Sequence, residues 1–161
     1  SWRVDKTYIK IKGKWKYFYR AVDSNGDTID FMLSAKRNRK AAKRFLKKAL
    51  GSKHNQILRV ITVDKNPVYP AAMNELKNDR ILPKNVGLRQ IKYLNNIVEQ
   101  DHRSIKRIVR PMLGFQSFST AIKTIKGIEI MHMIKKGQVD ILNRCVSAEV
   151  NFINQLFGIT T

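Results

Sequence analysis

The segment that most constrains the fold is residues 57–64, a run rich in β-branched side chains that ends in Asp64. The run follows a helical segment, and a near-continuous apolar strand reached through a helix is typical of a central parallel strand buried on both faces. The right-handed crossover rule places such a strand beside the first strand of the chain. Because ligand sites in these sheets lie at the carboxyl ends of strands, we expect Asp64 to border a site.

Residues 1–34 predict a three-stranded antiparallel meander that supplies the rest of this sheet. In the first strand, residues of alternating character point to opposite faces, and Asp5 falls on the same face as Thr7 and Ile9. The pair Asn25 and Gly26 favours a tight turn between the second and third strands, because both residues tolerate positive φ.

The remaining segments predict one edge strand and several helices. The fold class is therefore α/β: a mixed five-stranded sheet, with three antiparallel strands followed by parallel strands, flanked by helices. The edge strand is expected over residues 86–91, and the helices over residues 38–50, 71–78, 94–110, 119–135 and 147–157. The 94–110 helix combines an apolar face that includes Ile108 with a flanking polar stripe; the stripe contains Glu99, His102 or Arg103, Lys106 and Arg110.

The composition indicates a folded domain with a polyanionic partner. Lys and Arg number 32 against 12 Asp and Glu, a net charge of +20, which points to DNA or RNA. A hydrophobic content of 43% in 161 residues suits one globular domain and argues against a disordered basic tail. The single cysteine, Cys145, cannot form an internal disulfide, so a reducing cytoplasmic setting is expected. No apolar run approaches the ~18 residues of a membrane span.

Three acids form the candidate site: Asp5, Asp64 and Glu99. One aspartate lies on the first strand, one ends a buried strand, and the glutamate lies on a later helix. In so basic a chain, this is the set of acids that a site needs in order to hold two divalent cations against a nucleic-acid phosphate. Four local strings also point to a nucleic-acid enzyme: WRVDKTYIKIKGKWKYFYRAVDSNGDTIDF, RNRKAAKRFLKKAL, KYLNNIVEQDHRSIKR and TIKGIE. They resemble the insertion-sequence-six family of bacterial transposases, whose DDE domains share the RNase H-like fold of retroviral integrases.

This resemblance implies a set of expectations. The metal-binding triad falls on Asp5, Asp64 and Glu99, and the basic residue seven positions later on Lys106. The cofactor would be two Mg²⁺ ions, with Mn²⁺ as a substitute. The partners would be DNA, as transposon terminal inverted repeats and target DNA, and further copies of the chain, in the cytoplasm of a bacterium at its nucleoid.

The resemblance also implies a domain plan. Residues 1–136 would form the catalytic core and residues 137–161 a helical extension packed on that core. The N-terminal helix-turn-helix region that such transposases use to recognise DNA ends has no counterpart in this chain. The family usually has Glu after the first Asp, where this chain has Lys6. Because neighbouring residues of a strand point to opposite faces, Lys6 is expected to stay out of the metal site.

Several basic residues are candidates for DNA contact. Residues 36–48 hold eight Lys or Arg in thirteen positions with no acid among them, which favours backbone binding by that helix. The candidates are Lys40, Lys43, Arg44 and Lys47 on this helix, Lys10, Lys12 and Lys14 around the first turn, and Arg103, Lys106 and Arg110 on the later helix. Trp15 either stacks on an unpaired base or serves as a core or dimer contact.

Other residues and functions remain as alternatives. Asp101 faces the apolar side of its helix and is expected to be structural, paired with a buried arginine. His102 is expected to have a supporting or structural role. The rival functions are a non-catalytic or decayed nucleic-acid-binding fragment and an RNase H-type nuclease that cuts RNA in hybrids.

Overall fold

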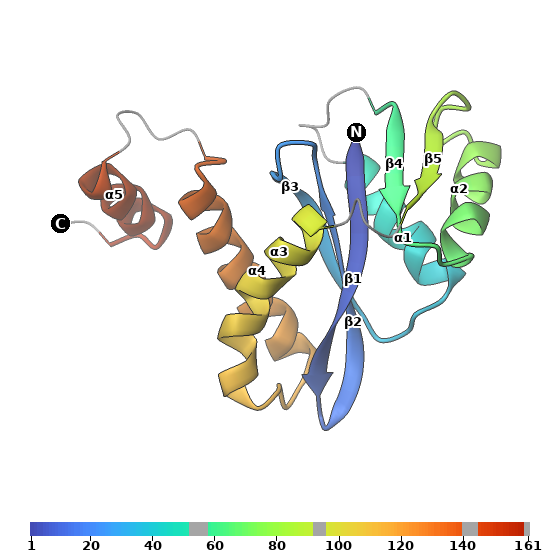
Figure 1. Cartoon of the computed structure of the whole chain (residues 1–161). Coiled ribbons are helices and arrows are strands. Elements are labelled where there is room, and N and C mark those ends of the chain that lie inside the picture. The colour runs from blue at the N-terminus through green and yellow to red at the C-terminus, as the bar shows by residue number, and fades with distance from the viewer. Residues whose placement is uncertain (52–57, 92–95, 140–144, 160–161) are drawn as a thin grey trace.

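The structure is a computed structural model that describes residues 1–51, 58–91, 96–139 and 145–159. Its centre is a five-stranded sheet with the strand order β3-β2-β1-β4-β5 (Figure 1). The strands are β1 (Trp2–Ile11), β2 (Lys14–Val22), β3 (Thr28–Ser34), β4 (Val60–Val63) and β5 (Gly87–Gln90). The mixed sheet predicted from the sequence is confirmed, although Ile57, at the start of the predicted fourth strand, lies outside the described residues.

Helices cover both faces of the sheet (Figure 1). The helices α1 (Arg39–Leu50) and α2 (Val68–Asn78) pack on one face, and α3 (Asn96–Val109) and α4 (Phe118–Lys136) lie on the other. A short 3-10 turn, η2 (Arg110–Met112), follows α3 and contains Pro111, which ends the helix. The last helix is α5 (Val146–Leu156).

Two apolar layers hold these helices to the sheet. One layer packs Val4 and Tyr19 of the sheet against Phe45 of α1 and Leu76 of α2. The other packs strand residues such as Ile9 against α3 and α4; its buried members include Ile11, Phe18, Leu33, Ile105, Val109, Ala121 and Ile125. Alternation along β1 therefore sends Val4 to one layer and Ile9 to the other, as the period of a strand requires.

The parallel pairing of β1 with β4 fixes the site edge of the sheet. Trp2 lies opposite Ile61 and Arg3 opposite Thr62, so the predicted crossover to a strand beside the first one is confirmed. In the described residues β4 ends at Val63, whereas β1 continues to Ile11. Beyond the end of β4, the second half of β1 therefore keeps β2 on one side, and on the other it borders the segment around Phe115, which bonds to Lys10 and Lys12.

One turn and two helix starts follow their local chemistry. Lys12 and Gly13 both have positive φ, 50° and 73°, which is the two-residue turn that matches the twist of an antiparallel hairpin. The side chain of Asn38 accepts a hydrogen bond from the Ala41 N–H and caps α1. The helix α2 begins at Val68, earlier than the predicted Ala71, because Pro67 and Pro70 fit the first turn of a helix.

The structure corrects one predicted face and leaves the C-terminal segment open. Ile108, predicted on the apolar face of α3, is 46% exposed, and Asp101 and His102 are buried in its place. No described residue of α5 is buried, so the expected packing of residues 137–161 on the core stays a prediction. Among the described helices, none is long and apolar enough to cross a membrane.

Candidate active site

Asp5 lies on β1 and points toward α3, with its side chain 16% exposed. Burial raises the pKa of Asp5 from 3.8 to about 6. The backbone and the charge of Lys6 act in the opposite direction, and the negative charges of Asp64 and Glu99 raise the pKa further. These last contributions mean that Asp64 and Glu99 each lie within electrostatic range of Asp5.

Asp64 is the first residue after β4 and is held by two contacts. Its Oδ1 accepts a hydrogen bond from the Asn66 N–H at 3.1 Å, a local turn that fixes the carboxylate beside the strand end. Its Oδ2 lies 2.7 Å from the Lys6 Nζ, in an ion pair in which the Lys6 side chain is 6% exposed.

The expectation that Lys6 stays out of the site is therefore wrong. Alternation does direct Lys6 to the α2 side of the sheet, where its ammonium lies 5.5 Å from the centre of the Tyr69 ring. However, the lysine stem is long, and Asp64 stands just beyond the last ladder residue of β4. The ammonium therefore reaches past the strand edge to a carboxylate that the strand period assigns to the other face.

Glu99 and Lys106 are exposed on α3, seven residues apart, so they share one face of the helix about two turns from each other. Arg103 and Arg110 are exposed on the same helix and the turn that follows it. Within the described residues, no group of three or more His, Cys, Asp or Glu is close enough to hold one ion together. Asp64 and Glu99 therefore lie near enough to Asp5 to affect its pKa, but the three carboxylates do not meet around one ion position.

His102 lies behind Asp5 and is buried, at 3% exposure. Its Nε2 is 3.7 Å from the Asp5 Oδ2, and neither ring nitrogen has a hydrogen-bond partner among the described residues. Burial, together with the charges of Arg20 and Lys106, lowers the pKa of His102 from 6.5 to about 3, so its imidazole is neutral. His102 was predicted on the exposed polar stripe, and the structure moves it to the buried side, against Phe18.

Comparisons with known proteins identify the family. The model of the family DDE_Tnp_IS240, described as a DDE domain, matches residues 1–138. The chain is 42% identical over 136 residues to a transposase for the insertion sequence-like element IS431mec of Staphylococcus aureus. The matched residues make up 84% of this chain. This chain belongs to the DDE domain family of insertion-sequence transposases. The Staphylococcus aureus transposase for insertion sequence element IS257 in transposon Tn4003 has the same identity. The DDE domain spans 58% of the length of these relatives.

Solved structures place the DDE domain in the integrase fold. The catalytic core of HTLV-2 integrase in complex with magnesium, in its dimeric form, is 12% identical, with a TM-score of 0.58 and 88% of each chain covered. The catalytic core of BIV integrase is 17% identical, with a TM-score of 0.51 and 66% of each chain covered. At this level of identity the likeness shows the fold alone, and it confirms the RNase H-like α/β class.

The donor set of the DDE domain suits the divalent cation that its family implies. All three candidate ligands are carboxylates, the donors that Mg²⁺ prefers. Burial raises the pKa of Asp5 because it disfavours the charged form of the carboxyl group, and Asp64 is paired with the ammonium of Lys6. Asp5, Asp64 and Glu99 are the residues that would hold such an ion, and the buried His102 lies 3.7 Å from Asp5.

A buried ionic cluster of the DDE domain fixes α3 and α4 to β2. The guanidinium of Arg20, which is fully buried, pairs with Asp101 of α3 at 3.3 Å and with Glu129 of α4. The Lys136 ammonium lies 2.6 Å from the Asp101 carboxylate and donates to the Gly26 carbonyl at 2.6 Å. The predicted pairing of Asp101 with a buried arginine is confirmed. The cluster holds the helix that carries Glu99 in register with the sheet.

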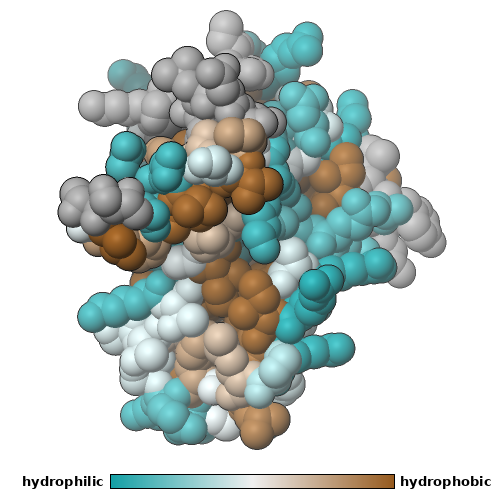
Figure 2. All heavy atoms as spheres, turned by 90° about the vertical axis from the view of Figure 1, so that its left-hand side faces the viewer, coloured by the Kyte–Doolittle hydropathy of each residue, from teal (hydrophilic) through white to brown (hydrophobic). Residues whose placement is uncertain are grey.

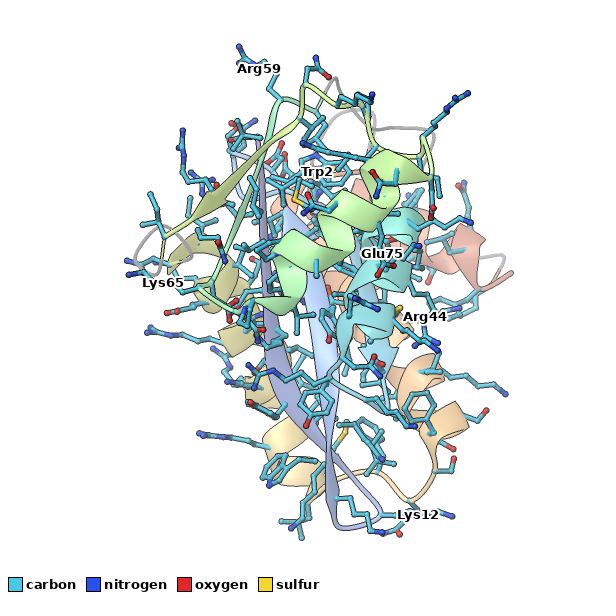
Figure 3. The ribbon with its side chains drawn as sticks, turned by 90° about the vertical axis from the view of Figure 1, so that its right-hand side faces the viewer. Trp2, Lys12, Arg44, Arg59, Lys65 and Glu75 are labelled. Carbon is cyan, nitrogen blue, oxygen red and sulfur yellow. The ribbon has the colours of Figure 1, made fainter. Side chains whose placement is uncertain are left out.

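The basic surfaces of the DDE domain are less uniform than predicted. Lys10, Lys12 and Lys14 of the first hairpin are exposed, and Lys12 lies at its tip (Figure 3). On α1, Lys40, Arg44 and Lys47 are exposed, but Lys43 lies 3.1 Å from Glu75 and 2.7 Å from Asp79 of the neighbouring helix segment. Arg39 also pairs with Glu75, and Lys48 pairs with Asp30. Acids from other elements therefore offset this face at Arg39, Lys43 and Lys48, although residues 36–48 contain no acid themselves.

Sequence reasoning missed three features of the site. Lys6 was excluded by strand alternation, although the length of its stem allowed the contact. The buried partners Arg20 and Glu129 carried one available signal, a charged residue at a position where the strand or helix pattern required an apolar one. The sequence offered Trp15 as a base-stacking, core or dimer residue, but it did not reveal the groove that Trp15 forms with Tyr8 and Tyr17, because that groove depends on how α3 crosses the strand.

Proposed function

We propose that this domain carries the phosphoryl-transfer chemistry of DNA transposition. In the first step water attacks a phosphodiester at the transposon end and releases a 3′-hydroxyl. In the second step that hydroxyl attacks a phosphodiester of target DNA, and the displaced 3′-oxygen of the target leaves with the electron pair. The proposal is supported by the charges of Asp64 and Glu99, which both act on Asp5, and by membership of the DDE domain family.

Each residue has a role that follows from its position. Asp5, on the central strand between Asp64 and α3, would face both ligand positions, with Asp64 on one side and Glu99 on the other. Two Mg²⁺ ions, or Mn²⁺ in their place, supply stabilisation of the attacking and leaving oxygens when bound. Lys106, exposed on the helix face of Glu99, would position a DNA phosphate. His102 would orient Asp5 from the buried side.

The proposed partners are transposon-end DNA, target DNA and further copies of the chain. The net charge of +20 supports a polyanionic partner. Joining two transposon ends to one target requires two active sites together, so the working form would be a homo-oligomer on DNA.

The second candidate is a nucleic-acid-binding domain that has lost catalysis, and the Lys6–Asp64 ion pair is the observation that favours it. Titration with Mn²⁺, followed by calorimetry, separates the two. The catalytic proposal expects binding by the wild-type chain that weakens sharply in Asp64→Asn. An absence of binding in both proteins would support the rival. Cleavage of RNA in RNA–DNA hybrids at the rate of DNA nicking would instead favour an RNase H-type nuclease.

Replacing Lys6 by Gln should strengthen Mn²⁺ binding about fivefold, because an ion pair of about 1 kcal/mol no longer competes for Asp64. The measurement is the Mn²⁺ dissociation constant from calorimetry at fixed ionic strength. Lys10→Gln is the matched control, since it removes one positive charge from the same strand without a contact to Asp64. Equal effects of the two substitutions would mean that only net charge matters and that Lys6 has no special position.

The double substitution Lys40→Gln and Lys47→Gln should reduce the salt dependence of duplex DNA binding. Each lost phosphate contact lowers the slope of log K against log salt by about 0.9, so the slope should flatten by about 1.8. Fluorescence anisotropy at four or more salt concentrations measures it. Lys43→Gln is the control, because Lys43 is already paired with Glu75 and Asp79 and should change the slope much less. An unaltered slope in the double variant would exclude α1 from the DNA interface.

A further inference from the structure

A groove of about 720 Å³ runs beside the second half of β1. Its walls are the first hairpin on one side and the C-terminal half of α3 with the following turn on the other. Its volume lies in the range of small-ligand sites. It is separate from the three carboxylates, since neither Asp5, Asp64 nor Glu99 lines it.

Three aromatic side chains from β1 and β2 form one wall of the groove: Tyr8, Trp15 and Tyr17. Trp15 is 61% exposed and Tyr8 45% exposed, although both are large and mostly apolar. The Trp15 and Tyr8 ring centres are 6.5 Å apart at 77°, edge to face, and Tyr8 and Tyr17 are 5.5 Å apart. Because an edge-to-face pair uses the edge of one ring, the cluster leaves ring faces available for a planar ligand.

The other groups that line the groove are apolar or cationic. Lys10, Lys106 and Arg110 are exposed along it, and no acid lies among the described residues that line it. The hairpin adds Lys12 and Lys14 at its tip, where Lys12 projects at the lower end of Figure 3. Figure 2 shows the side of the molecule that carries α4 and α5, where apolar side chains gather in the middle and hydrophilic ones lie mainly around them. Planar ring faces beside a row of cations are the two elements of a single-stranded nucleic-acid platform.

We propose that this groove binds an unpaired nucleotide of the DNA strand that passes through the active site. A base would stack on Trp15 and Tyr8, while the flanking phosphates would lie on Lys10, Lys106 and Arg110. The proposal rests on the proposed function for the identity of the strand. Duplex DNA is a poorer ligand for this groove, because its base faces are covered by stacking with neighbouring pairs.

The position of the groove suits a strand that continues from the scissile phosphate. Lys106 follows Glu99 by seven residues, which is about 10 Å along α3. This distance corresponds to about three nucleotides of one B-form strand at 3.4 Å each. A strand cut between Asp5 and Glu99 would therefore reach the aromatic residues with a base only a few nucleotides from the cut.

Binding of 5′-labelled oligonucleotides, measured by anisotropy in EDTA, tests the proposal without the metal site. The ligands are an eight-nucleotide thymidine single strand, a blunt duplex and the same duplex with a 3′ overhang. Trp15→Ala should weaken binding of the single strand and the overhang about tenfold and change the blunt duplex less than twofold. Trp15→Phe should retain most of the affinity, because a ring face is kept. Phe157→Ala, at an exposed aromatic on the end of α5, should change nothing.

Intrinsic fluorescence supplies a second measurement. Trp2 is buried at 4% exposure, so emission quenched by a stacked base comes from Trp15. Equal loss of single-strand and duplex binding, no loss at all, or a change of Trp15→Ala from dimer to monomer on gel filtration would each overturn the proposal. If the groove does not bind an unpaired nucleotide, metal-dependent nicking by the wild-type chain should still be observed. If the domain does not catalyse phosphoryl transfer, single-strand binding in EDTA should still be observed, so the two outcomes are distinguishable.

Discussion

Replacing Asp64 by Asn will reduce divalent-metal-dependent nicking of a labelled duplex by about 1,000-fold or more. The carboxamide keeps the size of the side chain and its bond to the Asn66 N–H but loses the charge that a cation requires. Metal assistance to a phosphoryl transfer is worth several kcal/mol, and each 1.36 kcal/mol is tenfold in rate. The measurement is a single-turnover nicking assay in saturating Mn²⁺, with DNA binding followed in parallel.

The control for this substitution is Asp79→Asn, which removes an acid that also pairs with a lysine, Lys43, but lies outside the site. It should nick DNA within about twofold of the wild type. Thermal unfolding of both variants excludes loss of fold as the cause. Nicking by Asp64→Asn within tenfold of the wild type would remove Asp64 from the metal site, and with it the proposed chemistry.

Replacing Arg20 by Met will lower the free energy of unfolding by about 3–5 kcal/mol, the cost of breaking a buried ion pair on one side. The substitution leaves the carboxylate of Glu129 fully buried without its counter-charge and removes one of the cations beside Asp101. Urea unfolding followed by circular dichroism measures the effect. Arg103→Met is the control, because Arg103 is exposed on α3 and should change stability by less than about 0.5 kcal/mol.

The pH dependence of Arg20→Met identifies Glu129 as the cause. Burial already raises the pKa of Glu129 above 4.5 against the opposing charge of Arg20, and loss of that charge raises it further. The folded variant then binds a proton more readily than the unfolded chain, so its stability falls as pH rises above 4.5. The deficit relative to the wild type should therefore shrink as pH is lowered from 7 toward 5. A deficit independent of pH would assign the loss to packing alone, and Arg20→Met combined with Glu129→Met should recover most of the stability.

Local pattern was sufficient to predict the sheet and its order of elements. The meander follows from strand alternation and the Asn25–Gly26 turn, and the position of β4 follows from the crossover rule applied to an apolar run after α1. The position of Asp64 at the carboxyl end of β4 followed from the same apolar run. Glu99 was a candidate because it is an acid on a later helix of a very basic chain, and the family resemblance then assigned it to the metal-binding triad.

The features that escaped prediction depend on side-chain reach and on contacts between distant elements. Lys6 reaches Asp64 because β4 ends at Val63, immediately before the aspartate, and the sequence does not indicate where this strand ends. The acids that offset Lys43 come from α2 and the residue that follows it, so the charge of a single helix could not reveal them. His102 and Ile108 exchanged their expected exposures because α3 presents Asp101 and His102 to the buried Arg20 and to Asp5.

The most direct test is a crystal structure of the chain soaked in Mn²⁺, with anomalous scattering to locate the ions. We predict two Mn²⁺ ions about 3.5–4 Å apart, held by Asp5, Asp64 and Glu99, with the Lys6 ammonium displaced from Asp64. Two results would contradict a metal site formed by these three carboxylates. In one, Lys6 still pairs with Asp64 and the Mn²⁺ ions lie elsewhere; in the other, no Mn²⁺ is bound at saturating concentration.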